Sequence, residues 1–166
     1  MNAHKNPAET YPVTIRPAEP RDSAGIRSLL AQMPRWETAA KRVSCNQGLV
    51  AVDDQGCIVG WLSGHHDSLA WENFPGYNMD EDWHCSFIQW LLVDENCRSA
   101  GIGAALMTRF ARESSEAGRD TIIASPQAGE RERSLVDFYY RLGYLRARSG
   151  HVHRGPWGPQ EHCPLP

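Results

Sequence analysis

One stretch of the sequence is the most informative about fold and function: Ile88-Gln-Trp-Leu-Leu-Val-Asp-Glu-Asn-Cys-Arg-Ser-Ala-Gly-Ile-Gly-Ala-Ala-Leu-Met107. Its first six residues, 88–93, are mostly apolar and predict a strand. A polar turn follows, and then a helix that begins at Gly101 and Gly103. The first amide N–H groups of a helix have no intrahelical acceptor, and glycines allow a phosphate to come close to them. Because the helix dipole adds roughly half a positive charge there and Arg98 adds a full charge, we predict an anion-binding site.

The spacing of these residues differs from that of the common nucleotide-binding loops. The chain has neither GxxxxGK[ST] nor GxGxxG here. It has Arg98-x-x-Gly101-x-Gly103, preceded by Val93-Asp94 and followed by an amphipathic helix. This pattern resembles the acyl-CoA-binding signature, Q/R-x-x-G-x-G/A, of the GCN5-related N-acetyltransferase (GNAT) family.

A second stretch strengthens the resemblance. Phe138-Tyr-Tyr-Arg-Leu-Gly-Tyr144 is similar to the FYxxxGF segment near the C-terminus of the same family. The two stretches have the separation that the family shows, and the resemblance extends over residues 13–154. It implies an N-acetyltransferase, an acyltransferase that transfers groups other than aminoacyl groups, with acetyl-CoA as co-substrate and no metal.

Length and composition set limits on the class of protein. The 166 residues suit one domain. Seventeen basic and twenty acidic residues give a net charge of −3, so we expect no nucleic-acid partner. No apolar run approaches the roughly 18–20 residues that span a bilayer, and residues 1–10 lack the apolar core of a signal peptide. We therefore predict a cytoplasmic protein without a membrane partner, for which a homodimer is an open arrangement.

The cysteines are odd in number and form no CxxC pair, so we expect reduced thiols and no structural zinc site. They are Cys45, Cys57, Cys85, Cys97 and Cys163.

Hydrophobic periodicity predicts alternating strands and helices. A long polar loop is expected at 65–83, and the strand at 121–125 should run parallel to the one before it because a helix separates them. The predicted elements are a strand at 11–16, a helix through Ile26, Leu29, Leu30 and Met33 that ends at Pro34, a short helix at 35–42, a hairpin of 49–53 and 57–62, a strand at 84–93, a helix at 101–117, the strand at 121–125, a helix at 134–142 and a hairpin of 144–148 and 151–154.

These elements predict an α/β fold. We expect a single-domain mixed, mostly antiparallel sheet of six to seven strands flanked by about four helices, which is the acyl-CoA N-acyltransferase fold. Residues 1–10 are predicted to be a disordered extension, 11–154 the acetyltransferase domain, and 155–166 an irregular proline-rich tail.

The resemblance assigns a donor site to two backbone segments. In the family the pantetheine arm pairs with the backbone of the fourth strand, and the pyrophosphate is bound by amides of the turn that follows. The residues implied here are Leu91, Leu92 and Val93 for the arm, and Arg98, Ser99, Ala100, Gly101, Ile102, Gly103 and Ala104 for the phosphates.

Tyr139 follows the phenylalanine of the second motif, where the family places a tyrosine that faces the CoA sulfur and acts as a general acid. The chemistry fits this position, because a thiolate leaving group needs a proton and a phenol can give one. The alternative interpretation is that Phe138, Tyr139 and Tyr140 only pack a core helix. Tyr140 is the substitute if Tyr139 has no catalytic role.

The chain departs from the family pattern at two kinds of position. Glu95 stands where a proline usually follows Val-Asp. Glu132 and Leu135 stand where the family often has asparagine and alanine, so a CoA contact from that asparagine is not expected.

The expected reaction is direct attack of a neutral amine on the thioester, with the carbonyl oxygen held by a backbone N–H, that of Val93. A base must first deprotonate the amine. Some family members use a glutamate of the fourth strand, and Phe87 occupies that position here. Gln89 points to the same face but cannot act as a base. The remaining candidates are His84, Glu72, Asp82, His65, His66 and a water molecule, of which His84 and Glu72 are our choice.

The acceptor site is expected in the loops between the first two helices and between the third and fourth strands. Aromatic walls with clustered carboxylates suit a small cationic amine such as an antibiotic, a polyamine or an amino-acid derivative. A solvated acidic loop anchored by aromatics is the alternative. These loops hold Trp36, Trp71, Glu72, Phe74, Tyr77, Asp80, Glu81, Asp82 and Trp83, and we predict that Trp36, Trp71, Asp82 and Trp83 bind substrate together with Gln89.

Other functions stay open at this point. The same fold can take its acyl group from a carrier protein or an aminoacyl-tRNA, or it can bind CoA without turnover as a sensor or interaction module. A metal enzyme using His65, His66, His84 and Cys85 is least favoured, because no HxxxH or CxxC spacing fixes a ligand geometry.

Overall fold

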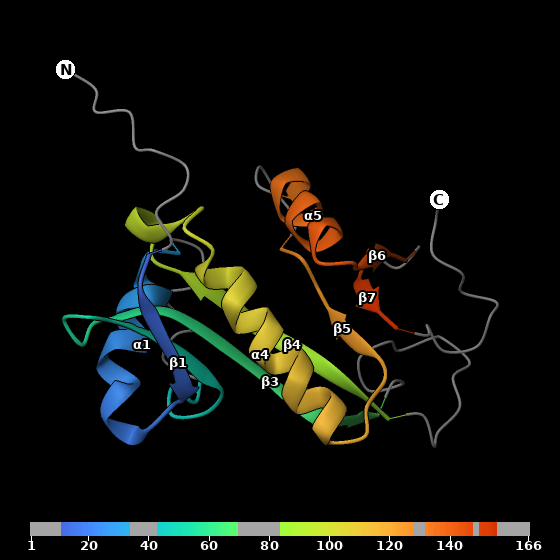
Figure 1. Ribbon diagram of the computed structural model, residues 1–166, viewed down its shortest axis with the longest axis horizontal. Coiled ribbons are helices and arrows are strands. Elements are labelled where there is room, and N and C mark those ends of the chain that lie inside the picture. The colour runs from blue at the N-terminus through green and yellow to red at the C-terminus, as the bar shows by residue number, and fades with distance from the viewer. Residues whose placement is uncertain (1–10, 34–42, 70–83, 128–131, 148–149, 156–166) are drawn as a thin grey trace. The chain divides into compact units, whose positions relative to one another are not determined.

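The computed structural model describes residues 11–33, 43–69, 84–127, 132–147 and 150–155. Over these residues seven strands form one mixed sheet in the order β1-β2-β3-β4-β5-β7-β6, accompanied by three α-helices (Figure 1). Strands β4 and β5 run parallel, as predicted from the helix between them. The strands are β1 Val13–Pro17, β2 Leu49–Asp53, β3 Ile58–Leu69, β4 His84–Val93, β5 Ile122–Ala124, β6 Leu145–Arg146 and β7 Val152–Arg154, and the helices are α1 Ser23–Ala31, α4 Ile102–Glu116 and α5 Glu132–Arg141.

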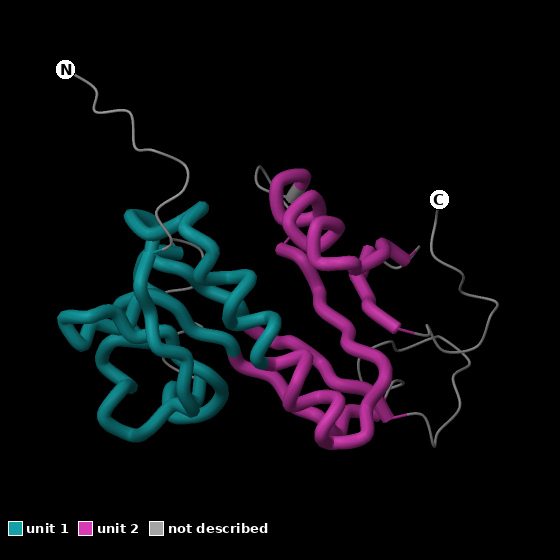
Figure 2. Tube along the Cα trace, viewed as in Figure 1, with its two compact units in different colours: residues 1–62, 91–109 teal, residues 63–90, 110–166 magenta. Residues whose placement is uncertain are grey.

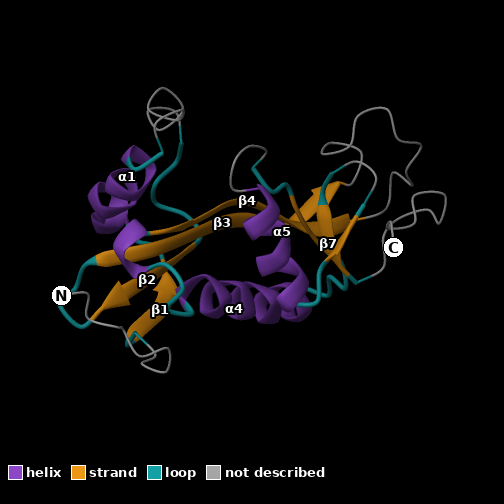
Figure 3. Cartoon of the chain, turned by 90° about the horizontal axis from the view of Figure 1, so that it is seen from above, coloured by secondary structure: helices purple, strands orange, loops and turns teal. Residues whose placement is uncertain are grey.

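The chain divides into two compact units (Figure 2). One comprises residues 1–62 and 91–109, and the other comprises residues 63–90 and 110–166. Strands β3 and β4 and helix α4 each contribute residues to both units. Figure 3 shows the helices in purple and the strands in orange.

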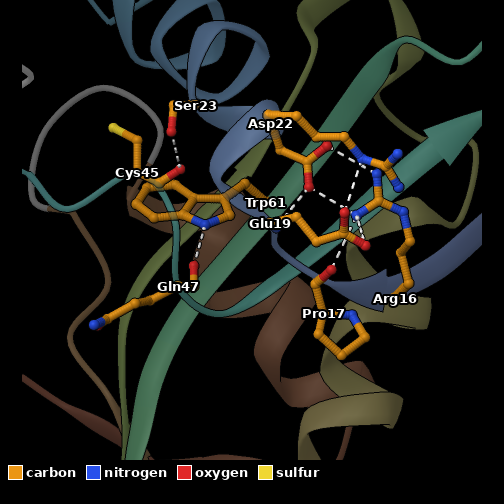
Figure 4. A network of polar contacts seen from close by, with 9 residues as sticks. Arg16, Pro17, Glu19, Asp22, Ser23, Cys45, Gln47 and Trp61 are labelled. Atoms are coloured by element: carbon orange, nitrogen blue, oxygen red, sulfur yellow. Dashed lines mark hydrogen bonds and ion pairs between the residues drawn. The ribbon is translucent and has the colours of Figure 1, made fainter.

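In the first unit, a paired arginine joins β1 to the start of α1 (Figure 4). The guanidinium of Arg16 donates to both carboxylate oxygens of Asp22, at 2.7 and 2.8 Å, and the amide of Glu19 donates to the same carboxylate at 2.8 Å. The hydrogen bonds from Arg16 lower the pKa of Asp22, which is almost fully buried. Because a buried carboxylate is stable only when it is paired, this contact fixes the entry into α1.

Two glycines of β3 allow α4 to pack closely against the strand. In the first unit, a Cβ on Gly60 would lie 2.9 Å from Ile102 Cγ2 and 3.0 Å from Leu106 Cδ1. In the second unit, a Cβ on Gly64 would collide with the carbonyl oxygen of Phe87 and lie 2.9 Å from the ring of Phe110. The side-chain period of a strand is two, so both glycines lie on the same face of β3. The missing side chains therefore set the position of α4 within each unit.

We predict that Gly64→Ala destabilises the protein by about 2 kcal/mol or more, because the colliding atom is backbone and cannot rotate away. Urea unfolding monitored by tryptophan fluorescence measures the free energy of unfolding. Gly56→Ala is the matched control: its Cβ meets nothing within 4 Å, and only the backbone φ of +82° opposes it, at about 1 kcal/mol. A Gly64→Ala protein as stable as the control would contradict this packing.

The predicted fold class is confirmed. Several predicted ends of strands and helices differ from the observed ones by one or two residues, and the end of one strand differs by more. Strand β3 continues to Leu69, so the loop expected from His65 begins later. Residues 63–69 are largely polar and carry no hydrophobic alternation, which is why periodicity missed them. The short helix predicted at 35–42 and the rest of the loop, 70–83, lie outside the described residues.

The described cysteines, Cys45, Cys57, Cys85 and Cys97, are free thiols. Within the described part of the chain, no helix has the length and apolar character that crossing a membrane requires.

Candidate active site

The turn between β4 and α4 has a defined backbone geometry. Asp94 follows β4 directly, and its carboxylate accepts from the amide of Asn96 at 2.9 Å, which caps the 3₁₀ turn η3 (Glu95–Cys97). After this turn the backbone is left-handed at Ser99 (φ 65°) and at Gly101 (φ 82°). A Cβ on Gly101 would meet no atom within 4 Å. The chain is therefore open to an approaching ligand at this point.

The helix that follows presents free amide groups by its geometry. The amide of Ala105 donates to the carbonyl of Gly101 at 3.0 Å, so the amides of residues 102–104 precede the first intrahelical bond. The side chains of Arg98 and Ser99 are exposed. Backbone donors, a left-handed glycine and an arginine are together the groups that bind a phosphate. The residues in this turn thus fit the predicted anion site.

The strand segment before the turn alternates in exposure. Leu92 is buried, whereas Leu91 and Val93 are half-buried. Phe87 and Gln89 lie two residues apart and therefore on one face of β4, as predicted, and Gln89 is exposed.

In the second unit, the end of α5 explains the second motif. The amide of Gly143 donates to the carbonyl of Tyr140 and the amide of Tyr144 to that of Tyr139, both at 3.0 Å. This is a Schellman cap, in which Gly143 supplies the left-handed residue (φ 82°). The ring of Tyr144 packs edge-on against that of Tyr139, with centroids 5.5 Å apart. The spacing of tyrosine, glycine and the final aromatic therefore follows from helix termination.

The two neighbouring tyrosines of α5 differ in exposure. Tyr139 is 5% exposed and Tyr140 is 46% exposed. Burial raises the pKa of Tyr139 to about 12, so its hydroxyl keeps its proton throughout the neutral range. Among the described residues, no side chain or backbone group hydrogen-bonds this hydroxyl. Tyr139 is thus a buried, protonated donor.

The predicted base candidates of the second unit lie in different environments. His66 Nδ1 is 2.9 Å from Ser86 Oγ, which contacts Ser114 Oγ at 2.7 Å, so His66 belongs to a buried polar network. His65 lies on the opposite face of β3, with its ring stacked 6.2 Å from that of Phe87. His84 Nε2 is 3.7 Å from a carboxylate oxygen of Asp67. The three histidines thus contact different partners.

The other predicted acceptor-side residues lie outside the described residues. They are Trp36, Trp71, Glu72, Phe74, Tyr77, Asp80, Glu81, Asp82 and Trp83.

A metal centre finds no support in the part of the chain that the structure describes. No group of three or more His, Cys, Asp or Glu side chains there is arranged to hold a metal ion. Cys85, one of the ligands considered, is buried, its thiol lies 3.6 Å from the carbonyl oxygen of Ser68, and burial raises its pKa to about 12.

Comparison with models of protein families shows which family this chain belongs to. The model of the acetyltransferase (GNAT) family matches residues 16–144, which include both motifs. The chain therefore belongs to the GNAT acetyltransferase family, as the sequence predicted. A search of curated proteins found no match.

Solved structures of the family share the fold. YhbS of Escherichia coli, solved in complex with CoA, is 21% identical to this chain and has a TM-score of 0.58. The alignment covers 92% of this chain and 85% of the YhbS chain. A GCN5-related N-acetyltransferase from Kribbella flavida is 17% identical over 87% of this chain and 98% of its own, with a TM-score of 0.63. yncA of Salmonella typhimurium, solved with its cofactor acetyl-CoA, is 16% identical over 87% and 94%, with a TM-score of 0.60.

Two of the polar arrangements that were not predicted join segments that are distant in the chain. One is the network of His66, Ser86 and Ser114, and the other links Gln32 to Asp94. The residues that form each contact lie at least 20 positions apart in the chain. No local sequence pattern therefore predicts these contacts.

We predict that stability falls as the pH is lowered through about 6.5. Burial lowers the pKa values of His66, His151 and His153. A group whose folded pKa is depressed binds protons more readily when unfolded, so acid favours unfolding in this window. Urea unfolding between pH 8 and pH 5.5 measures the slope. The nearby carboxylate of Glu113 opposes the shift at His66 without reversing it.

His66→Gln is the matching variant, because its amide can still reach Ser86 but does not titrate. Its stability should depend less steeply on pH than that of the wild type. Equal slopes for the two proteins would show that His66 is not a source of the pH dependence.

Proposed function

We propose that this protein transfers an acetyl group from acetyl-CoA to the primary amine of a small cationic molecule in the cytoplasm, by direct attack. The observation that carries the proposal is the turn from Arg98 to Gly103, whose left-handed residues and free helical amides suit a pyrophosphate. Family membership supports the acetyl transfer. Relatives of the same fold that were solved with CoA and acetyl-CoA support the donor.

The donor is held by backbone more than by side chains in this proposal. Amides from Arg98 through Ala104 bind the phosphates, and the Arg98 guanidinium adds charge. The backbone of Leu91, Leu92 and Val93 pairs with the pantetheine arm. The N–H of Val93 then faces the thioester oxygen, where negative charge develops during attack.

Tyr139 donates a hydrogen bond to the departing sulfur. Burial raises the pKa of its phenol to about 12, so the phenol stays protonated at neutral pH and is available to the thiolate as it leaves. As the carbon–sulfur bond breaks, Tyr139 gives its proton to the sulfur as the general acid and is reprotonated from water.

The residues proposed to bind the acceptor amine are inferred from the sequence. In this proposal aromatic rings, a carboxylate and an amide bind the cationic amine: Trp36, Trp71 and Trp83, Asp82, and Gln89. His84 or Glu72 takes the ammonium proton, directly or through water.

We predict that acetyl-CoA at 100 times its Kd raises the Tm by about 5–10 °C, since selective binding to the folded state adds about 2.7 kcal/mol. Gly103→Asp should abolish the shift, because it adds bulk and negative charge to the phosphate site. Thr108→Asp adds the same charge to an exposed position of α4 and should keep the shift. Differential scanning fluorimetry measures all three. No shift for the wild type at millimolar acetyl-CoA would remove the proposed donor.

We predict that Tyr139→Phe lowers kcat by about 10- to 100-fold, the loss expected for one hydrogen bond to a charged atom, and changes the KM for acetyl-CoA less than about threefold. The assay is thiol release from acetyl-CoA with a panel of polyamines, amino acids and aminoglycosides.

Tyr140→Phe is the control, because Tyr140 is its exposed neighbour, and should retain full activity. Undiminished kcat in Tyr139→Phe would reject the role of Tyr139. Tight binding without turnover on any amine would favour the alternative of a CoA-binding sensor module.

A further inference from the structure

We propose that Gln32 is a positioning residue for the donor site, which holds the turn after β4 in its phosphate-binding conformation through Asp94 and Glu95. The inference rests on the proposed function, since it concerns how the acyl-CoA site is kept in shape. All residues that carry it belong to the first unit.

Gln32 is the C-cap of α1, and its side-chain amide makes two hydrogen bonds to the turn. Its Nε2 donates to Asp94 Oδ2 at 2.8 Å, and its Oε1 accepts from the amide of Glu95 at 3.1 Å. A carboxylate only accepts and a backbone amide only donates, so a single orientation of the Gln32 amide satisfies both partners. Neither a carboxylate nor an ammonium at this position could do the same.

Asp94 connects this contact to the rest of the turn. Its second carboxylate oxygen accepts from the amide of Asn96 at 2.9 Å and from its side chain at 3.2 Å. Its backbone amide donates to the carbonyl of Val59 in β3, and its carbonyl accepts from Cys97, both at 2.9 Å. Asp94 thus ties α1, β3 and η3 together.

The turn needs such support because its backbone is unfavourable by itself. Ser99 has a φ of 65° although it carries a side chain, and non-glycine residues persist in that region only where the surroundings hold them. Gln32 and Asp94 fix the residues that lead directly into Arg98 and Ser99. When this contact is lost, the turn can relax, and the amides that follow lose their alignment toward a phosphate.

The test uses variants that change the polarity of the pair. Gln32→Glu places a second carboxylate against Asp94, which should weaken acetyl-CoA binding by about tenfold or more at pH 8. Two facing carboxylates share a proton at lower pH, so the ratio of variant Kd to wild-type Kd should fall toward one near pH 6. Isothermal titration of acetyl-CoA at both pH values gives this ratio.

The double variant Gln32→Glu/Asp94→Asn reverses the hydrogen bond and keeps the net charge. The asparagine introduced at position 94 can accept from the amide of Asn96, while its NH₂ donates to the glutamate introduced at position 32. The other oxygen of that glutamate accepts from the amide of Glu95. We expect the Kd of the double variant at pH 8 to return to within about threefold of the wild type, because the lost hydrogen bond is replaced by an equivalent one. The Tm of each variant is measured as well, so that the rescue of the Kd can be compared with any recovery of stability.

Asp22→Asn is the control for general destabilisation, since it breaks the Arg16 pair at the other end of α1. It should lower the Tm and leave the Kd within about twofold of the wild type. An unchanged Kd in Gln32→Glu, or a loss that neither low pH nor the double variant restores, would overturn the inference and leave the proposed function intact. Absence of acetyl-CoA binding by the wild type would overturn both.

Discussion

The N-terminus of α4 has to lie close to β3 and still leave its first amides open. Gly60 meets the first requirement, because Ile102 and Leu106 occupy the space that its side chain would fill. The left-handed residues Ser99 and Gly101 meet the second by turning the chain sharply into the helix. Both requirements concern the short segment from Ser99 to Leu106. The donor site that we propose exists only while both are satisfied.

Much of the fold follows from patterns that the sequence displays. Apolar periodicity located α1, α4 and the buried strands, and glycines located the ends of α4 and α5. The cap at Gly143 shows why the second motif is recognisable: left-handed backbone demands glycine, and the next aromatic ring covers Tyr139. Motifs of this kind are local, and local geometry is what a sequence encodes most directly.

Contacts between distant polar residues could not be predicted in the same way. In the second half of β3, His66 contacts Ser86 of β4. Hydrophobic periodicity could not predict this contact, because the residues there are polar. Gln32 ends α1 and could have faced solvent; only the fold shows that it meets Asp94. Spacing was therefore enough to propose the residues of the turn as a phosphate site, whereas the residues that contact this turn from elsewhere in the chain required the structure.

The proposed function depends most directly on binding of the acetyl-CoA phosphates by the turn from Arg98 to Ala104. Titration of the ¹⁵N-labelled protein with CoA, followed by two-dimensional NMR, tests it residue by residue. We predict that the amides of Gly101, Ile102 and Gly103 show the largest changes in chemical shift and saturate together. Saturable changes confined to other segments, with these amides unmoved, would contradict it.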